Sequence, residues 1–257
     1  MTSETWTMPP GRAARGGRAW RARRVRVGAE GLHGALTVPP EARGLVVCVH
    51  VGDGDDAPTH GRPGAAGERL CAGHEATRHR DLVRVLAQHH LATLFVDLLS
   101  GDEAGEAGAA RGCGPRCDLA LLVARTVQCL DWAVTRVELA GLRVGLCAAG
   151  EGAAAALRAA TQRPAHVAAV VARSGRPDLA GDDLGRVAVP TLLIVGGNDT
   201  EALRFNRQAM LALVCEKRLE VVAGATRRFE EPGALETMAH LAGAWLAGRL
   251  ASGLARH

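Results

Sequence analysis

Continuous apolar runs alternate with amphipathic segments along most of this chain. The runs are almost free of polar residues and occupy positions 45–49, 91–96, 167–171 and 191–195. Strands buried on both faces of a parallel sheet have this pattern, whereas strands with one wet face alternate apolar and polar positions. Helical periodicity fills intervals at positions 82–90, 119–135 and 205–214. The alternation predicts a single α/β domain over residues 23–250, with a mostly parallel, twisted sheet and helices on both faces.

Length and composition narrow the class of protein. The chain has 257 residues, of which 47% are hydrophobic, and can therefore bury one large core. It contains no apolar run long enough for a membrane span or a signal-peptide core, so the sequence predicts a cytoplasmic protein without a membrane partner. Seven cysteines, an odd number, argue against a disulfide framework. Nothing in the sequence indicates a cofactor.

Two clusters of residues of types that bind metals lack the arrangement of a metal site. Aspartates, histidines and a cysteine gather between positions 53 and 79, but no pair has the spacing that would place two ligands on one helical face. The pair Cys113 and Cys117 lacks two further ligands nearby. We therefore expect a solvated loop in the first region and no metal site in either.

The first 22 residues form an arginine-rich tail that we expect to be disordered. Residues 1–26 contain seven arginines against one acid, Glu4, so this segment carries +6 while the whole chain carries +4. The remaining residues are therefore slightly acidic. A basic arm of this kind suits nucleic acid or anionic lipid, but it lacks the interleaved aromatic residues of stacking platforms. The sequence thus disfavours nucleic acid as a partner.

A strand runs directly into a helix at residues 144–157, where Val-Gly-Leu-Cys-Ala-Ala-Gly-Glu-Gly precedes an alanine-rich segment. This layout resembles the nucleophile elbow of the α/β-hydrolase superfamily, and in particular of its dienelactone-hydrolase-like branch. That branch has Gly-x-Ser-x-Gly or Gly-x-Cys-x-Gly here. The resemblance extends over about residues 25–246 and implies an α/β-hydrolase fold. It places Gly150 at the position of the nucleophile and Ala148 at that of the first glycine.

The same resemblance locates the other two members of a catalytic triad. Asp199 follows the apolar run 191–195 within Gly-Gly-Asn-Asp and matches the family acid. After the next strand the family has Gly-Ala-Thr-His, whereas this chain has Arg227 in place of the histidine. A guanidinium keeps its proton at neutral pH, so Arg227 cannot act as a general base. The resemblance therefore implies a degenerate triad.

Charged and β-branched residues alter the rest of the implied site. His50 is retained from the His-Gly dipeptide of the family oxyanion hole, but Val51 replaces the glycine and Glu151 follows the nucleophile position. Valine resists the positive φ angles that glycine adopts. We expect Arg227 to form an ion pair with Asp199, and with Glu151 if it reaches, which would plug the cleft. The second interpretation is a clamp for an anionic ligand.

These departures favour a pseudohydrolase that binds a small molecule or a protein partner, as a monomer or a homodimer. Two enzymatic alternatives stay open. A Gly-x-Cys-x-Ala elbow centred on Cys147 would make the chain an esterase or lactonase. Glu151 and Asp199, assisted by His50, would support a cyclase, lyase or isomerase if burial raised a carboxyl pKa. Among the serines only Ser174 follows a core strand on the side of the cleft, which makes a serine nucleophile a weaker alternative.

Overall fold

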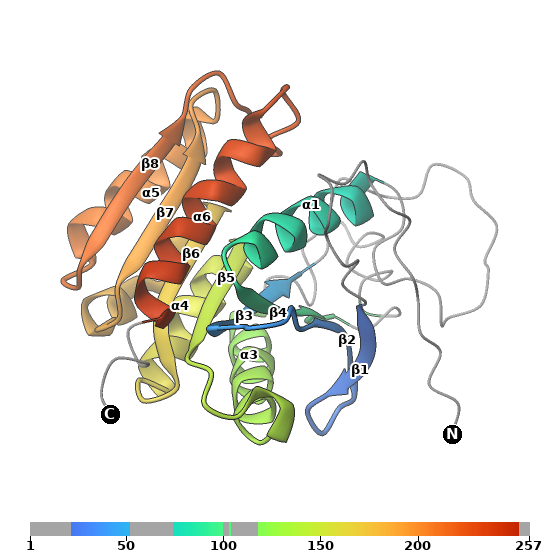
Figure 1. Ribbon diagram of the computed structural model, residues 1–257. Coiled ribbons are helices and arrows are strands. Elements are labelled where there is room, and N and C mark those ends of the chain that lie inside the picture. The colour runs from blue at the N-terminus through green and yellow to red at the C-terminus, as the bar shows by residue number, and fades with distance from the viewer. Residues whose placement is uncertain (1–21, 52–73, 100–102, 104–117, 252–257) are drawn as a thin grey trace.

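One eight-stranded sheet runs through the whole domain (Figure 1). The computed structural model describes residues 22–51, 74–99, 103 and 118–251. The strands lie in the order β1-β2-β4-β3-β5-β6-β7-β8. Their bounds are β1 Arg23–Val27, β2 Leu32–Thr37, β3 Gly44–His50, β4 Leu91–Asp97, β5 Val144–Gly150, β6 Val167–Gly175, β7 Thr191–Gly196 and β8 Lys217–Val222. Strand β2 pairs antiparallel with β1 and β4, and the other pairs are parallel.

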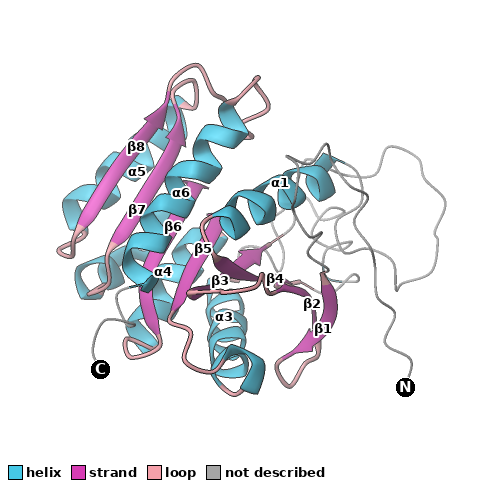
Figure 2. Ribbon diagram, in the orientation of Figure 1, coloured by secondary structure: helices cyan, strands magenta, loops and turns pink. Residues whose placement is uncertain are grey.

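Helices cover both faces of this sheet (Figure 2). The α-helices are α1 His74–Gln88, α3 Leu119–Val134, α4 Gly152–Gln162, α5 Thr200–Ala212 and α6 Ala234–Leu250, and the 3-10 segments are η2 Val137–Leu139 and η3 Pro177–Arg186. Helices α1 and α6 pack on each other across one face, while α3, α4 and α5 cover the other. Parallel strands need such crossover helices, so the alternation of runs along the chain is the direct cause of this architecture.

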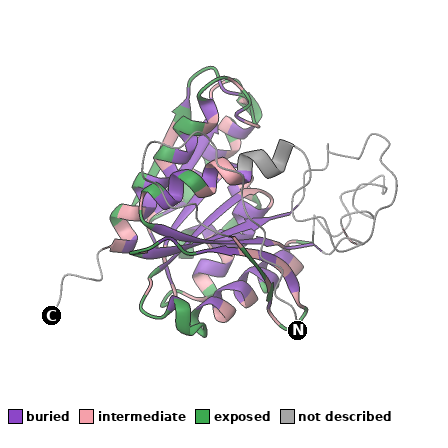
Figure 3. Ribbon diagram, turned by 45° about the vertical axis from the view of Figure 1, so that its right-hand side comes forward, coloured by how far each residue is buried: buried purple, intermediate pink, exposed green. Residues whose placement is uncertain are grey.

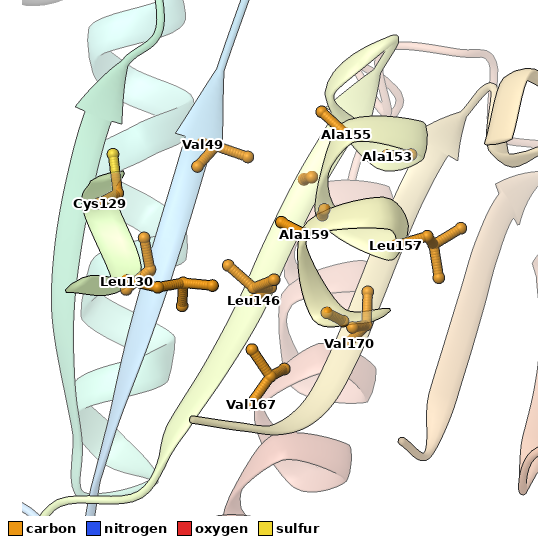
Figure 4. Packing of buried hydrophobic residues seen from close by; sticks show 14 of the residues in the cluster. Val49, Cys129, Leu130, Leu146, Ala153, Ala155, Leu157, Ala159, Val167 and Val170 are labelled. Carbon is orange, nitrogen blue, oxygen red and sulfur yellow. The ribbon is translucent and has the colours of Figure 1, made fainter. Parts of the chain in front are cut away.

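The core divides into two apolar layers, one on each face of the sheet. Buried residues are concentrated in the central strands, as Figure 3 shows. On the α4 face, the alanines of α4 pack against β5, β3 and β6, with Leu146 and Val170 beneath them (Figure 4). Their short side chains let the helix lie close to the sheet. This close approach fixes the start of α4 relative to the end of β5.

Two helices begin earlier than the sequence pattern predicts. Helix α5 starts at Thr200 rather than 205, because the Asp199 carboxylate accepts a hydrogen bond from the Ala202 N–H and caps the first turn. Helix α1 starts at His74 rather than Leu82. Its first half is rich in charged residues, so the sequence there shows no helical repeat of apolar positions.

Several sequence predictions concern residues that the structure does not describe. Residues 1–21, the pair Cys113 and Cys117, and most of the acidic, histidine-rich segment lie outside the described residues. Three of the arginines counted with the tail, Arg23, Arg24 and Arg26, belong to β1. The described part contains no helix long and apolar enough to cross a membrane.

Candidate functional site

The turn from β5 into α4 has the geometry of an elbow at Gly150. Its φ angle is +53°, in the left-handed region, and α4 starts two residues later. A Cβ atom built on Gly150 would meet only one atom within 4 Å, Arg227 Nη2 at 4.0 Å. The position therefore has room for the side chain of a nucleophile. In this chain it carries none.

Two neighbouring loops hold the residues at the positions of the acid and the histidine. The loop after β7 bonds to the loop after β8 through Gly197 N to Val222 O, Asn198 N to Ala225 O and Asn198 Nδ2 to Gly224 O, at 2.8–2.9 Å. A Cβ atom on Gly196 would lie 2.4 Å from the Ala225 oxygen, so the two backbones are in direct contact. This contact brings Arg227 to the end of the sheet that carries Gly150.

Only one of the two carboxylate oxygens of Asp199 accepts a hydrogen bond from the described residues. Its Oδ1 atom caps α5, whereas Oδ2 is buried and has no hydrogen-bond partner among the described residues. A histidine at position 227 would supply a ring N–H in this region. A buried acceptor without a donor is unfavourable, so the Oδ2 atom of Asp199 is a position where an added donor would be stabilising.

The predicted ion pair between Arg227 and Asp199 is not formed. Arg227 is exposed, and in the described part of the chain neither Asp199 nor Glu151 lies within 4.0 Å of its guanidinium. The long side chain instead places Nη2 over the elbow at Gly150. Arg227 therefore does not plug the cleft by neutralising Asp199.

Glu151 occupies the first position of the helix turn after Gly150. Its side chain makes no capping hydrogen bond to α4. The pKa of the nearby Arg176 is raised, first by its hydrogen bonds to Asp178 and more weakly by the negative charge of Glu151. Arg176 thus offsets part of the charge that Glu151 brings to the start of α4.

The region of the implied oxyanion hole is apolar. Val51 is buried, and its Cγ2 atom lies 3.2 Å from a Cβ built on Gly152, so the valine packs directly on the start of α4. His50 is only 9% exposed, and its ring lies 5.3 Å from that of His79 and 6.0 Å from that of Phe95. This ring cluster sits on the face covered by α1 and includes His79, which the sequence analysis considered only as one of the metal-binding residue types between positions 53 and 79.

The acid–base residues considered for a lyase come from separate strands. His50 ends β3, Glu151 follows β5 and Asp199 follows β7, with β5 and β6 lying between the first and the last. Neighbouring strands are about 4.8 Å apart. The three residues therefore follow three different strands of the sheet, β3, β5 and β7.

Ser174 is a buried residue beside the elbow that sequence reasoning placed only roughly. It is the extra residue in β6 where the pairing shifts from Ala149–Arg173 to Gly150–Gly175. Its φ angle is +40°, which is uncommon outside glycine. Its hydroxyl is buried and has no hydrogen-bond partner among the described residues.

Cys147 lies inside β5, three residues before the turn. It is 2% exposed and pairs in register with Cys48 of β3. The hydrogen bond between the two thiols lowers the pKa of Cys147 and raises that of Cys48; burial opposes the first shift and adds to the second. The structure encloses Cys147 within the sheet instead of presenting it at the elbow. No group of three histidine, cysteine or acidic residues in the described ranges is placed to hold a metal ion.

Comparison with known proteins gives the family. No protein-family profile matches the chain. A solved dienelactone hydrolase from Anabaena variabilis superposes with a TM-score of 0.75 and is 38% identical, over 90% of this chain and 98% of that one. This chain belongs to the dienelactone-hydrolase-like branch of the α/β-hydrolase superfamily. The predicted fold is thereby confirmed.

Other members of the α/β-hydrolase superfamily share the fold at lower identity. A dienelactone hydrolase-like promiscuous phosphotriesterase from metagenomic libraries superposes with a TM-score of 0.60 and 19% identity, over 91% of this chain and 99% of that one. A CIB-like hydrolase from Thermoplasma acidophilum gives 0.62 and 14%, over 90% of this chain and 100% of that one. These likenesses extend to the fold alone.

A longer relative has a different name. A protein of Mycobacterium tuberculosis, provisionally named a phosphoribosyl transferase, is 41% identical over 212 residues. The match covers 82% of this chain but 42% of that protein. This dienelactone-hydrolase-like chain therefore spans about two-fifths of the length of the curated relatives that it matches.

Proposed function

We propose that this domain is a pseudohydrolase, which binds a small anionic molecule at the elbow and does not hydrolyse it. One observation carries the proposal: the Arg227 guanidinium lies over Gly150, where a hydrolase of this branch would have its nucleophile and base. Glycine offers no attacking atom. Arginine holds its proton at every physiological pH and cannot serve as a base.

Three features of the elbow favour an anion as ligand. Arg227 is exposed, and a guanidinium presents a planar set of donors that matches carboxylate or phosphate. The N-terminus of α4 adds partial positive charge on the same side. The hydroxyl of Ser174, in the strand that pairs with Gly150, is buried and has no hydrogen-bond partner among the described residues. Glu151 opposes an anion, and Arg176 reduces that opposition.

The enzymatic alternatives have weaker support. A cysteine hydrolase would need Cys147 to leave the interior of β5, where it is 2% exposed. A lyase would need Glu151 and Asp199 as free bases, but Asp199 caps α5 and Glu151 lies in the field of Arg176.

Calorimetric titration tests the binding. The probes are inorganic phosphate, ribose 5-phosphate and succinate, the second chosen because the longer relatives carry a phosphoribosyl transferase name. We expect at least one probe to bind the parent and Arg227→Leu to weaken it tenfold or more, as loss of a charge-assisted pair predicts. Arg43→Leu, at the opposite end of the strands, is the control and should bind like the parent. Equal binding by parent and Arg227→Leu, or no binding of any probe, overturns the anion clamp.

Turnover of p-nitrophenyl acetate tests the loss of chemistry separately. The parent should be inert, and Gly150→Ser with Arg227→His should gain turnover because a hydroxyl then fits the elbow and Asp199 Oδ2 receives a donor. The matched control, Gly150→Ala with Arg227→His, should stay inert. Turnover by the parent that Cys147→Ala abolishes would instead identify a cysteine hydrolase.

A further inference from the structure

Strand β8 forms an edge of the sheet that lacks two of the usual protections against pairing, a bulge and a proline. It is the outermost strand in Figure 1, and it pairs only with β7 in the described part of the chain. Its register is unbroken, without a bulge, and it contains no proline. Proteins blunt exposed edges with charges, bulges or prolines, because a free edge recruits another strand. The opposite edge, β1, carries charges of one sign only, on Arg23, Arg24 and Arg26, and would repel a second copy of itself. Strand β8 carries both signs of charge.

The free side of β8 presents its odd-numbered backbone groups. The carbonyl of Glu216 accepts from Thr191 N, and the carbonyl of Val222 accepts from Gly197 N, so the even positions face β7. Since the direction alternates along a strand, the N–H and C=O groups of Lys217, Leu219 and Val221 point outward. Leu219 is the middle of this set.

The charges on β8 are self-complementary about Leu219. Arg218 and Glu220 flank it and form an ion pair with each other on the α6 side of the sheet. If a second β8 runs antiparallel with Leu219 opposite Leu219, each Arg218 faces the other copy's Glu220. These are non-hydrogen-bonded positions, where opposing Cα atoms are about 4.5 Å apart and side chains come closest. Leu219 itself exchanges both backbone hydrogen bonds with its counterpart.

The surfaces on either side of β8 expose apolar side chains that a second copy could bury. Large apolar side chains are exposed on the α5 side, namely Val221 at 46%, Val214 at 75% and Leu211 at 87%. On the α6 side, a groove of about 710 Å³ lies next to Arg218 and Glu220 and contains Trp245. A strand pair alone buries less than the roughly 1,200 Å² of a stable interface. These flanks supply apolar surface and space for the partner's side chains.

We propose that two copies of this chain join through antiparallel pairing of their β8 strands about a twofold axis at Leu219. The contact is isologous, because the same surface serves both copies and the symmetry closes at two. The sheet then continues from one copy into the other.

Sedimentation velocity of the full chain tests the dimer. The parent should dimerise. Arg218→Glu and Glu220→Arg, each alone, place like charges at both facing positions and should weaken the dimer about tenfold or more. Mixing the two single variants restores opposite charges at both positions, so they should form a heterodimer. The charge swap Arg218→Glu with Glu220→Arg should dimerise like the parent, as should the remote control Arg43→Glu.

Melting temperatures of each variant separate a lost interface from a lost fold. A parent that remains monomeric at every concentration overturns the proposal. So does a parental dimer that neither single reversal weakens, since the two copies would then meet elsewhere.

Discussion

Gly150 and Gly196 end two strands of the same sheet, yet they are glycines for opposite reasons. Gly150 has a left-handed φ of +53° and open space around its missing Cβ. A Cβ on Gly196 would lie 2.4 and 2.5 Å from the carbonyl oxygens of Ala225 and Thr226. The first site is open, and the second is closed by backbone. Packing therefore does not explain why the elbow lacks a side chain, and the framework that would position one is intact.

The closed site should be the more sensitive to substitution. Gly196→Ala forces a methyl group against two backbone oxygens that cannot rotate away, and we expect a loss of about 3 kcal/mol in the free energy of unfolding. Gly185→Ala is the matched control, because no atom lies within 4 Å of its Cβ position. Urea unfolding measures both. A loss below that of Gly185→Ala would show that the two loops separate easily.

At Gly175, the space for a Cβ atom is occupied by a side chain and not by backbone atoms. Its Cβ position is 2.4 Å from the Cβ of Ala153 in α4. We expect Gly175→Ala to lower the free energy of unfolding by about 2 kcal/mol. Adding Ala153→Gly should return part of this loss, since the two methyl groups compete for one space. A double-mutant cycle by urea unfolding with strictly additive losses would contradict this account.

The open site should tolerate a side chain at a smaller cost. Gly150→Ala places a residue with a Cβ atom in the left-handed conformation, but the added methyl group overlaps no neighbour. We therefore expect a loss of about 1 kcal/mol in the free energy of unfolding. Gly150→Ser should behave alike. Thermal and urea unfolding report it. A loss as large as that of Gly196→Ala would mean that the elbow is closed after all.

Asp199 should show the smallest change. Asp199→Ala removes the cap of α5, which is worth about 1 kcal/mol, but also removes the buried Oδ2 atom that has no partner. We expect a net loss below about 1 kcal/mol by urea unfolding. Asp199→Asn keeps an acceptor for Ala202 N and adds a donor, and should be at least as stable as Asp199→Ala. A loss of several kcal/mol for Asp199→Ala would indicate a donor to Oδ2.

The fold was predictable from the sequence, because buried parallel strands leave uninterrupted apolar runs such as 191–195. The positions of Gly150, Asp199 and Arg227 followed from short motifs at the strand ends. The direction of the Arg227 side chain did not, since a long, exposed side chain on a loop takes its orientation from surroundings that no local pattern encodes. The predicted ion pair with Asp199 failed for that reason.

Long-range polar contacts could not be predicted from the sequence either. Arg125 is buried in α3 and bonds to Glu30, Glu103 and the Leu98 carbonyl. Glu30 is 95 residues away along the chain, and no spacing rule links the two. The positive φ of Ser174 arises from a bulge between β5 and β6, which depends on how two strands meet.

The open elbow also has an evolutionary meaning. Some glycine and serine codons, and some arginine and histidine codons, differ by a single base. The backbone at Gly150 already accommodates a Cβ, and the loop that carries Arg227 is already held against the acid loop. A few base changes would therefore place a serine and a histidine at these two positions. If the domain is a pseudohydrolase, as we propose, its loss of hydrolysis is reversible.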